Sequence, residues 1–242
     1  MPKYRFAIVV GASSGIGAEI VRLLAKEGCK VAAIARREDK LKKLAAEFPG
    51  LVIPVAHDVT CFDEVPGVFQ SVTGQLGGLD LIVYASGVMP AVSGAEFDFA
   101  KDRQMIEVNV LGAIAWLNQA AIRFQNTKCG SIVAIGSVAG DRGRCGQPVY
   151  NTSKAALTTY MEALRNRVAR FGVKVVTIKP GPTATEMTSH MHSSGMASAA
   201  AVASFVLRKS DKTGEHYVKF GHRIAFFIIR HFPSWLFRRL NV

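Results

Sequence analysis

The chain has 242 residues, of which 49% are hydrophobic and 20% charged, and this composition excludes a disordered chain. Its length favours one large domain with a buried core. The formal net charge of +12 favours anionic partners such as nucleic acid, acidic lipid or phosphorylated ligands.

Neither a membrane span nor a targeting segment is expected. No apolar run reaches the roughly 18–20 residues that a span needs. The first residues lead into a short strand and lack the apolar core of a secretory signal. The four cysteines form no CxxC pair, which is typical neither of a zinc cluster nor of a disulfide scaffold and fits a reducing cytosol. We therefore expect a cytoplasmic protein without a metal site.

Strand-like and helix-like segments alternate along the chain. Short apolar or β-branched runs predict strands, and apolar residues at helical spacing predict helices. The predicted strands are Arg5–Val10, Lys30–Ala35, Leu51–Ala56, Leu79–Tyr84, Ser131–Gly136 and Val173–Lys179. The predicted helices are one that carries Ile20, Val21, Leu24 and Ala25, followed by Lys40–Phe48, Ala100–Phe124 and Val149–Phe171. The segment Thr183–Ala203, rich in small and polar residues, is expected to be mobile.

This alternation predicts an α/β fold. Nearly continuous apolar strands separated by helices are typical of a parallel sheet that is covered on both faces. We expect a single Rossmann-type, doubly wound parallel sheet of about seven strands with helices on both faces. No linker divides the chain, so we expect one domain over residues 1–221 and a basic, aromatic-rich C-terminal extension over residues 222–242.

A glycine-rich turn, Gly11-Ala12-Ser13-Ser14-Gly15-Ile16-Gly17, joins the first strand to the first helix. Backbone N–H groups and the dipole at a helix start favour a phosphate. Gly11 permits the tight turn, Gly15 lets a phosphate approach, and Gly17 lets the helix pack on the sheet. The spacing differs from GxGxxG and also occurs in structural turns, but its place after the first strand predicts a dinucleotide site.

The second strand ends in two arginines, Arg36 and Arg37. In NAD-binding sheets an acidic residue at this position usually binds the ribose 2′-hydroxyl. A guanidinium instead matches a 2′-phosphate in charge and bidentate geometry. The pair therefore predicts a preference for NADP(H). Glu38 and Asp39 follow immediately, so NAD(H) stays open as an alternative, as does a solvated arginine pair.

Tyr150 and Lys154 stand four positions apart near the start of a predicted helix, so they lie on one face. An ammonium beside a phenol lowers the phenol pKa, which is about 10 in free tyrosine. Such a shift suits Tyr150 for acid–base chemistry. Ser137 follows the strand Ser131–Gly136, at the sheet edge where ligands bind. The tyrosine–lysine pair alone is also compatible with a surface contact.

Together these motifs resemble the short-chain dehydrogenase/reductase family, over the stretch Phe6–Gly221. Gly11–Gly17 resembles the family's cofactor turn and Tyr150–Lys154 its YxxxK motif, with Ser137 at the usual spacing before the tyrosine. Asn109 matches the asparagine that completes the catalytic tetrad. The resemblance implies an enzyme that acts on CH–OH donors with NAD(P)+ as acceptor.

The resemblance also implies a cofactor site. Asp58 and Val59 resemble the pair that contacts adenine, and Pro180–Thr185 resembles the PG motif beside the nicotinamide. Val10 replaces the usual threonine, and Tyr84–Gly87 stands where the family has Asn-Asn-Ala-Gly, so amide contacts of the central strand are expected to be lost. The implied cofactor-binding residues are Gly11, Ser13, Ser14, Gly15, Ile16, Gly17, Arg36, Arg37, Asp58, Val59, Ala85, Ser86, Gly87, Tyr150, Lys154, Pro180, Gly181, Thr183 and Thr185.

The reaction implied by the resemblance is a reversible hydride transfer between NADP(H) and a carbonyl or alcohol carbon. In the reductive direction Tyr150 gives a proton to the carbonyl oxygen, and Ser137 hydrogen-bonds that oxygen. Lys154 lowers the pKa of Tyr150 and holds the nicotinamide ribose. Asn109 anchors a water that passes protons to Lys154.

The segment after the PG motif, from Thr185 to Met196, covers the substrate in the family. Here it contains three methionines, which give an adaptable apolar lining. We therefore expect a lipophilic carbonyl or alcohol. His190 and His192 are expected to be polar residues of this cover, because an HxH pair alone is a poor metal signal.

The end of the chain combines apolar, aromatic and basic residues. Thr213–Gly221 resembles the family's last strand, and the chain continues for 21 residues beyond it. From Phe205 to Val242, eight Lys or Arg residues stand against two acidic residues, which is half of the net charge. This end is too short to span a membrane. An interfacial helix on acidic lipid, a flap over the pocket and a subunit contact remain open.

A homodimer or homotetramer is implied by the resemblance. The predicted helices Ala100–Phe124 and Val149–Phe171 correspond to the family's association surface, and they carry more apolar residues than one sheet face requires. The apolar residues that favour a subunit contact include Ile114, Trp116, Leu117 and Leu164.

Two other functions fit parts of the sequence. A dinucleotide-sensing regulatory protein would keep the fold without the chemistry, but it has no need to retain Tyr150 and Lys154. A nucleic-acid-binding protein would use the +12 charge, but the basic residues form no continuous stripe and no motif of that class is present. The oxidoreductase is therefore favoured, with no nucleic-acid partner.

Overall fold

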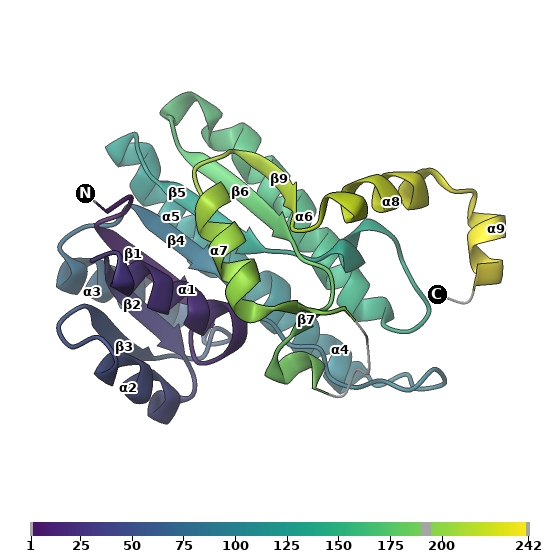
Figure 1. Cartoon of the computed structure of the whole chain (residues 1–242), viewed down its shortest axis with the longest axis horizontal. Helices are drawn as coiled ribbons and strands as arrows, with labels where there is room; N and C mark the ends of the chain where they lie inside the picture. The colour runs from purple at the N-terminus through teal and green to yellow at the C-terminus, as the bar shows by residue number, and fades with distance from the viewer. Residues whose placement is uncertain (1, 190–194, 241–242) are drawn as a thin grey trace.

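The computed structural model describes residues 2–189 and 195–240. Its centre is a sheet of seven parallel strands in the order β3-β2-β1-β4-β5-β6-β9 (Figure 1). These strands are β1 (Phe6–Val10), β2 (Lys30–Ala35), β3 (Val52–Ala56), β4 (Leu81–Tyr84), β5 (Ser131–Ile135), β6 (Lys174–Lys179) and β9 (Gly214–Tyr217). The predicted doubly wound parallel sheet is confirmed.

Helices cover both faces of the sheet. One core cluster joins the sheet to α3 (Val65–Leu76), α5 (Gly112–Thr127) and α6 (Pro148–Val168), and the other joins it to α1 (Gly15–Lys26), α2 (Glu38–Ala46) and α7 (Ala199–Lys209). Side chains alternate along each strand, so Ile8 and Val10 enter the first cluster, whereas Ala7 and Val9 enter the second. Burial on both faces explains why the strands are continuous apolar runs.

Two of these helices lie where the sequence analysis predicts none. Helix α3 buries Val65, Phe69, Val72 and Leu76 on one face. Helix α7 overlaps the segment that was expected to be mobile, and that expectation is wrong for this part. The hydroxyl of Ser198 accepts a hydrogen bond from the N–H of Ala201 at 3.1 Å and so caps α7, whose Val202 and Val206 are fully buried.

The predicted helix Ala100–Phe124 is longer and interrupted. It consists of α4 (Phe99–Ile106), a π-helical turn (Glu107–Leu111) and α5. The stretch Phe99–Thr127 is long and apolar enough to cross a membrane, but more than half of its most apolar part is buried inside the protein. It is the core helix of a folded domain.

Most of the apolar residues that favoured a subunit contact are buried in the core of the chain. Trp116 and Leu117 are fully buried and Leu164 is 5% exposed, so these three belong to the core. Leu111 and Ile122 remain exposed on the same helical region. The expected oligomer therefore rests on the family resemblance and not on Trp116, Leu117 or Leu164.

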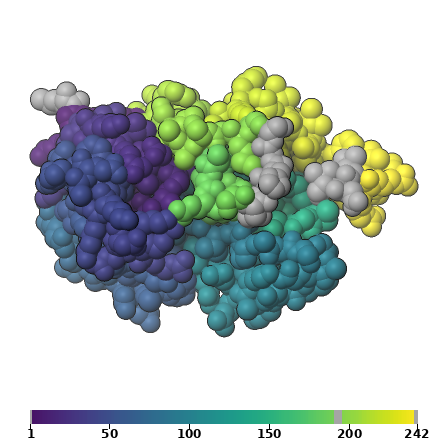
Figure 2. Space-filling model, turned by 60° about the horizontal axis from the view of Figure 1, so that its bottom comes forward, coloured from purple at the N-terminus to yellow at the C-terminus, as the bar shows by residue number. Residues whose placement is uncertain are grey.

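The chain ends in a helical arm. Strand β9 stops at Tyr217, before the end of the predicted segment Thr213–Gly221, and α8 (Phe220–His231) and α9 (Ser234–Phe237) follow. In Figures 1 and 2 this arm, coloured yellow, lies at one end of the molecule, and Figure 1 shows it extending away from the sheet.

The topology positions a ligand site at one edge of the sheet. From β1 the chain moves outward to β2 and β3, and then crosses to β4 on the other side of β1. The carboxyl ends of β1 and β4 therefore flank a crevice, which is where open α/β sheets bind their ligands.

Candidate active site

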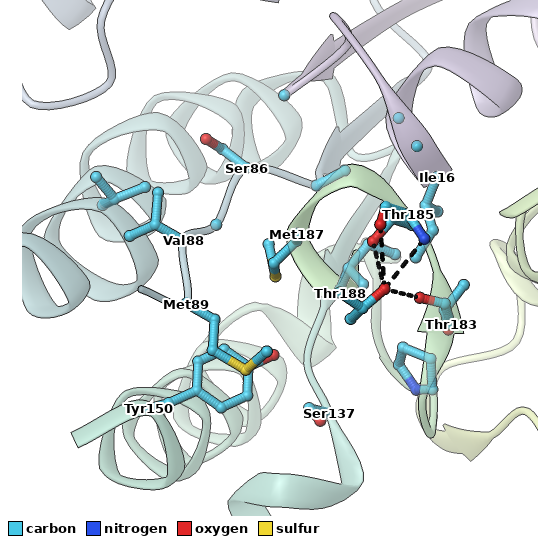
Figure 3. A pocket seen from close by; sticks show the side chains of 18 of the residues that line it. Ile16, Ser86, Val88, Met89, Ser137, Tyr150, Thr183, Thr185, Met187 and Thr188 are labelled. Carbon is cyan, nitrogen blue, oxygen red and sulfur yellow. Dashed lines mark hydrogen bonds between the residues drawn. The ribbon is translucent and has the colours of Figure 1, made fainter. Parts of the chain in front are cut away.

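A cleft of about 590 Å³ opens at the carboxyl ends of the strands. Every predicted cofactor-binding residue lines it, as do Ser137, Tyr150 and Lys154. Figure 3 shows Ser86, Val88 and Met89 on the segment after β4, with Thr183, Thr185 and Thr188 on the segment after β6. Sequence positions more than 170 residues apart therefore meet in one cavity.

The glycine turn fits closely against its surroundings. Gly11 has φ +89°, and a Cβ there would lie 2.4 Å from the backbone nitrogen of Ser86. A Cβ on Gly17 would lie 2.2 Å from the Gly11 carbonyl oxygen. Ser14 is the N-cap residue of α1 but, among the described residues, its side chain makes no cap hydrogen bond to the helix. The first N–H groups of α1 are therefore available to an anion.

The predicted arginine pair lies at the edge of this turn. Arg37 donates hydrogen bonds to the hydroxyls of Ser13, at 2.8 and 3.1 Å, and Ser14, at 2.7 Å. Its Nη1 also pairs with the Glu186 carboxylate at 2.6 Å, and Lys40 pairs with the same carboxylate. Hydrogen bonds from Lys40 and Arg37 lower the pKa of Glu186 to about 2. Two cations thus pair with the Glu186 carboxylate, and one of them, Arg37, is also held by the two serine hydroxyls of the glycine turn.

The adenine end of the cleft carries Asp58 and Val59, as predicted. Asp58 accepts hydrogen bonds from the N–H and hydroxyl of Thr60, and its carboxylate lies 3.6 Å from Nη1 of Arg36. His57, which the sequence analysis missed, also lines this end. Its ring is buried and its two nitrogens have no hydrogen-bond partner within the described part of the chain.

Tyr150 and Lys154 share one face of α6. The Lys154 Nζ lies 5.6 Å from the centroid of the Tyr150 ring, and it donates a hydrogen bond to the Ile135 carbonyl oxygen at 3.2 Å. Lys154 is only 4% exposed, and this burial lowers its pKa from 10.5 to about 8. A buried ammonium thus lines the cleft beside the Tyr150 ring.

The pKa of Tyr150 differs from the sequence-based expectation. Burial raises this pKa, and a hydrogen bond from Ser137 and the charge of Arg144 act in the opposite direction. The groups that act against burial are therefore Ser137 and Arg144, whereas the Lys154 ammonium donates its hydrogen bond to the Ile135 carbonyl. In this state Tyr150 is a neutral phenol, which is the protonation state of a proton donor.

Ser137 follows β5 and is half-buried at the start of a 3₁₀ turn, Val138–Asp141. Its hydroxyl oxygen accepts a hydrogen bond from the N–H of Ala139 at 3.0 Å, which holds the side chain in place. The Ser137 hydroxyl and the Tyr150 phenol therefore stand together on the wall of the cleft.

Asn109 lies behind the cleft wall, in the middle of the π-helical turn. Its Oδ1 accepts a hydrogen bond from the N–H of Val88 at 2.8 Å, and its Nδ2 donates to the Val88 carbonyl at 3.0 Å and to the Ser153 hydroxyl at 3.0 Å. The side chain is fully buried. Asn109 therefore fastens the wall segment after β4 to α6 through its side chain. π-Helical turns are frequent at such functional positions.

Tyr84 makes a contact in place of those expected to be lost where Tyr84–Gly87 replaces Asn-Asn-Ala-Gly. Its fully buried hydroxyl donates a hydrogen bond to the Val108 carbonyl at 2.6 Å. A Cβ on Gly112 would lie 2.6 Å from the Tyr84 oxygen, so a larger residue there would collide with it. Tyr84 thus connects the central strand to the π-helical turn, and the expected loss of contacts is compensated at this position.

The segment after β6 is ordered by Thr188. Its hydroxyl donates to the Thr183 carbonyl at 2.6 Å and accepts from the N–H of Thr185 at 3.1 Å (Figure 3). Met187 lines the cleft, as expected for an apolar cover. His190, Met191 and His192 lie outside the described residues.

Several cleft residues were missed by the sequence analysis. Arg144 and Gln147 lie between Ser137 and Tyr150, so the spacing of the two motifs could have indicated them. The Oε1 atom of Gln147 is buried without a hydrogen-bond partner among the described residues, which marks it as an available acceptor. Glu186 lies in the segment after the PG motif, and no sequence pattern marks it as a cleft residue.

Comparison with known proteins agrees with this geometry. The model of the short chain dehydrogenase family matches residues 5–194. An uncharacterised oxidoreductase of Myxococcus xanthus is 37% identical over 189 residues, which are 77% of this chain and 75% of the relative. An uncharacterised oxidoreductase of Mycobacterium tuberculosis is 32% identical over 188 residues, which are 75% of this chain and 74% of the relative.

Solved structures show the same fold. The structure of gox2181 has a TM-score of 0.85 and 25% identity, and the match covers 91% of this chain and 96% of that one. The structure of ElxO with NADP bound has a TM-score of 0.83 and 21% identity, and the match covers 91% of this chain and 99% of that one. Together with the family match over most of its length, these findings show that the chain belongs to the short-chain dehydrogenase family of oxidoreductases.

Proposed function

We propose that the protein is an NADP(H)-dependent oxidoreductase that interconverts a carbonyl and an alcohol on a lipophilic small molecule. The observation that carries this proposal is the grouping of the Ser137 hydroxyl, the Tyr150 phenol and the Lys154 ammonium on the wall of one cleft. The open start of α1 lines the same cleft.

The residues fit a bound dinucleotide. Gly11 and Gly17 leave no room for a side chain in the glycine turn, and the first turn of α1 is open to a pyrophosphate. Arg37, Ser13 and Ser14 provide donors for a ribose 2′-phosphate, and Glu186 now supplies the negative charge that such a phosphate would bring. The NADP found with ElxO belongs to a relative of the same fold and is consistent with this preference.

When bound, the nicotinamide would supply or accept a hydride at the substrate carbon. Tyr150, neutral because burial raises its pKa, donates its proton to the oxygen of a carbonyl and takes it back from an alcohol. Ser137 hydrogen-bonds that oxygen and stabilises its negative charge. Lys154 carries its ammonium 5.6 Å from the centroid of the Tyr150 ring and lines the cleft, where it would hold the nicotinamide ribose.

The lining near Tyr150 supports a lipophilic substrate. Val88, Met89, Val138 and Met187 provide apolar surface, and methionine adapts to ligands of different shape. The Oε1 atom of Gln147, which accepts no hydrogen bond from any described residue, would orient a polar group of the substrate. This combination of apolar walls and few polar groups is typical of small-molecule sites.

A coenzyme assay tests the proposal. Oxidation of NADPH and of NADH is followed with a panel of lipophilic aldehydes and ketones and with small polar carbonyls. We expect turnover with NADPH and a lipophilic carbonyl. The variant Arg37→Ala should weaken NADPH binding at least about tenfold and leave NADH binding unchanged, since it removes a charge-assisted contact to the 2′-phosphate alone.

The rival function, a dinucleotide-sensing regulatory protein, gives a different result in the same assay. NADPH binding without turnover on any carbonyl of the panel would favour that rival and contradict the oxidoreductase. A preference for NADH that Arg37→Ala does not change would contradict the assignment of the 2′-phosphate site.

A further inference from the structure

The C-terminal arm presents a continuous apolar surface to the solvent. Phe220, Ile224, Phe227 and Ile228 of α8 are between 50% and 73% exposed. Their spacing puts them on one face of the helix, and we call this face the tail stripe. Trp235 of α9 is 58% exposed and extends the apolar character of the arm. Four large apolar side chains left open on a helix of 12 residues mark an interaction surface.

Only positive charges accompany the tail stripe. From Val218 to the end of the chain, the sequence has one lysine, four arginines and no acidic residue. Arg223, Arg238 and Arg239 are exposed, and the Arg239 guanidinium lies 5.7 Å from the Trp235 ring centroid. An apolar helical face with arginines and an exposed tryptophan is typical of helices that lie in a lipid interface.

The body of the protein holds the arm by its other side. Arg142 donates hydrogen bonds to the Arg230 carbonyl at 3.0 Å and to the Ser234 hydroxyl at 3.1 Å, and its guanidinium carbon lies 4.8 Å from the centroid of the Phe237 ring. The His222 ring packs on Gly181, where an added Cβ would come within 2.3 Å of it. These contacts fix the arm and leave the tail stripe outward.

The arm does not cover the cleft in the described structure. The last residue in chain order that lines the cleft is Thr188, so no described residue of the arm belongs to the lining. The tail stripe therefore does not form a flap over the pocket.

We propose that the tail stripe docks on an anionic lipid surface, with α8 lying in the plane of the membrane. Charge decides between this surface and a second copy of the chain. A second copy would bring another protein of net charge +12 against the arginines that flank the tail stripe, and these like charges repel each other. An anionic bilayer attracts the same arginines, and each arginine near such a surface strengthens binding about fivefold. The helix is far shorter than the roughly 20 residues needed to span.

Docking by the tail stripe would bring one wall of the cleft near the membrane. His222 of α8 contacts Gly181, which lines the cleft beside Pro180. A lipophilic substrate dissolved in the bilayer would then be close to the site. The docking itself does not depend on the chemistry in the cleft, so either proposal can fail without the other.

Vesicle co-sedimentation of the full chain tests the docking. Phosphatidylcholine vesicles are compared with mixed phosphatidylcholine–phosphatidylserine vesicles, at low and high salt. We expect binding to the mixed vesicles that is at least about tenfold stronger than to the neutral ones and that weakens with salt, because the arginines contribute through charge.

Matched variants locate the contact. Ile228 is 57% exposed on α8 and Ile122 is 56% exposed on α5, so the same substitution to serine can be compared at both sites. Ile228→Ser should weaken vesicle binding about tenfold, whereas Ile122→Ser should leave it unchanged. Arg238→Gln should weaken binding to mixed vesicles about fivefold, and Arg167→Gln, on exposed α6 surface, should not.

Three results would overturn the proposal. One is no binding to either vesicle. Another is equal loss of binding in Ile228→Ser and Ile122→Ser. The third, seen by sedimentation velocity without lipid, is a dimer that Ile228→Ser dissociates while vesicle binding is absent, which would assign the tail stripe to a second copy. Equal melting temperatures of the variants show that a loss of binding does not come from unfolding.

Discussion

The buried ammonium of Lys154 is expected to lower the free energy of unfolding of the protein. Its pKa falls from 10.5 to about 8 through burial. At about 1.4 kcal/mol per pKa unit, the charged form costs the folded protein about 3 kcal/mol at neutral pH. Lys154→Met keeps the length of the side chain and removes the charge. It also removes the hydrogen bond to the Ile135 carbonyl, which is worth about 1 kcal/mol. The variant should therefore be more stable by about 2 kcal/mol at neutral pH and inactive as an oxidoreductase.

The stability difference between Lys154→Met and wild type should depend on pH. The folded-state pKa of Lys154 lies below the unfolded value, so the unfolded chain binds more protons between pH 8 and 10.5. The wild-type penalty is fully present below pH 8 and disappears as the pH rises to 10.5. Urea unfolding across this range should thus show an advantage of Lys154→Met that shrinks at alkaline pH.

A surface lysine provides the control. Lys26 is exposed at the end of α1, and Lys26→Met should change neither the stability at neutral pH nor the pH profile. If Lys154→Met is less stable than wild type at neutral pH, or if the two proteins have parallel pH profiles, the argument that burial of this charge is costly is wrong.

Three further results are expected. Glu186→Gln should bind NADPH about fivefold more tightly and NADH as before, since it frees Arg37 from an exposed ion pair worth up to about 1 kcal/mol; an equal gain for both coenzymes would contradict this. Tyr84→Phe should lower the free energy of unfolding by about 1–2 kcal/mol, because a buried main-chain carbonyl loses its donor, and chemical denaturation measures the change. Arg144→Gln should raise the pKa of Tyr150 further, so the alkaline fall of the reduction rate should move to higher pH; an unchanged profile would show that the Arg144 charge does not reach the phenol.

The sheet and most of the cofactor cleft could be predicted from the sequence for a physical reason. A parallel sheet buried on both faces requires continuous apolar strands, such as Phe6–Val10, and these are visible without tertiary information. The glycine turn directly follows β1, and the two arginines directly follow β2. Their positions at the carboxyl edge of the sheet followed from the topology alone.

Helices α3 and α7 were hidden by their composition. Helix α3 contains Pro66, Gly67 and Gly74, which are typical of turns, and its helical state depends on packing of Phe69 and Val72 into the core. Helix α7 begins with three alanines, which resemble a small-residue linker but are strong helix formers.

Contacts between distant segments could not be read from the sequence. Glu186 meets Arg37 across 149 positions, and no local pattern marks that pairing. The side chain of Asn109 forms two hydrogen bonds with the backbone of Val88, and these depend on how the π-helical turn packs. The hydrogen bond from Lys154 to the main-chain carbonyl of Ile135 likewise depends on packing between distant segments.

Tyr150→Phe tests the central claim most directly. Titration with NADPH and turnover with an active lipophilic carbonyl are measured on the same preparation, and Tyr160→Phe is the control. Tyr160 also lies on α6, but its hydroxyl donates to Asn118 at 2.9 Å outside the cleft. Tyr150→Phe should bind NADPH as wild type does and lose turnover by about 10²-fold or more, while Tyr160→Phe keeps it. Wild-type turnover in Tyr150→Phe would show that the phenol in this cleft is not the proton donor.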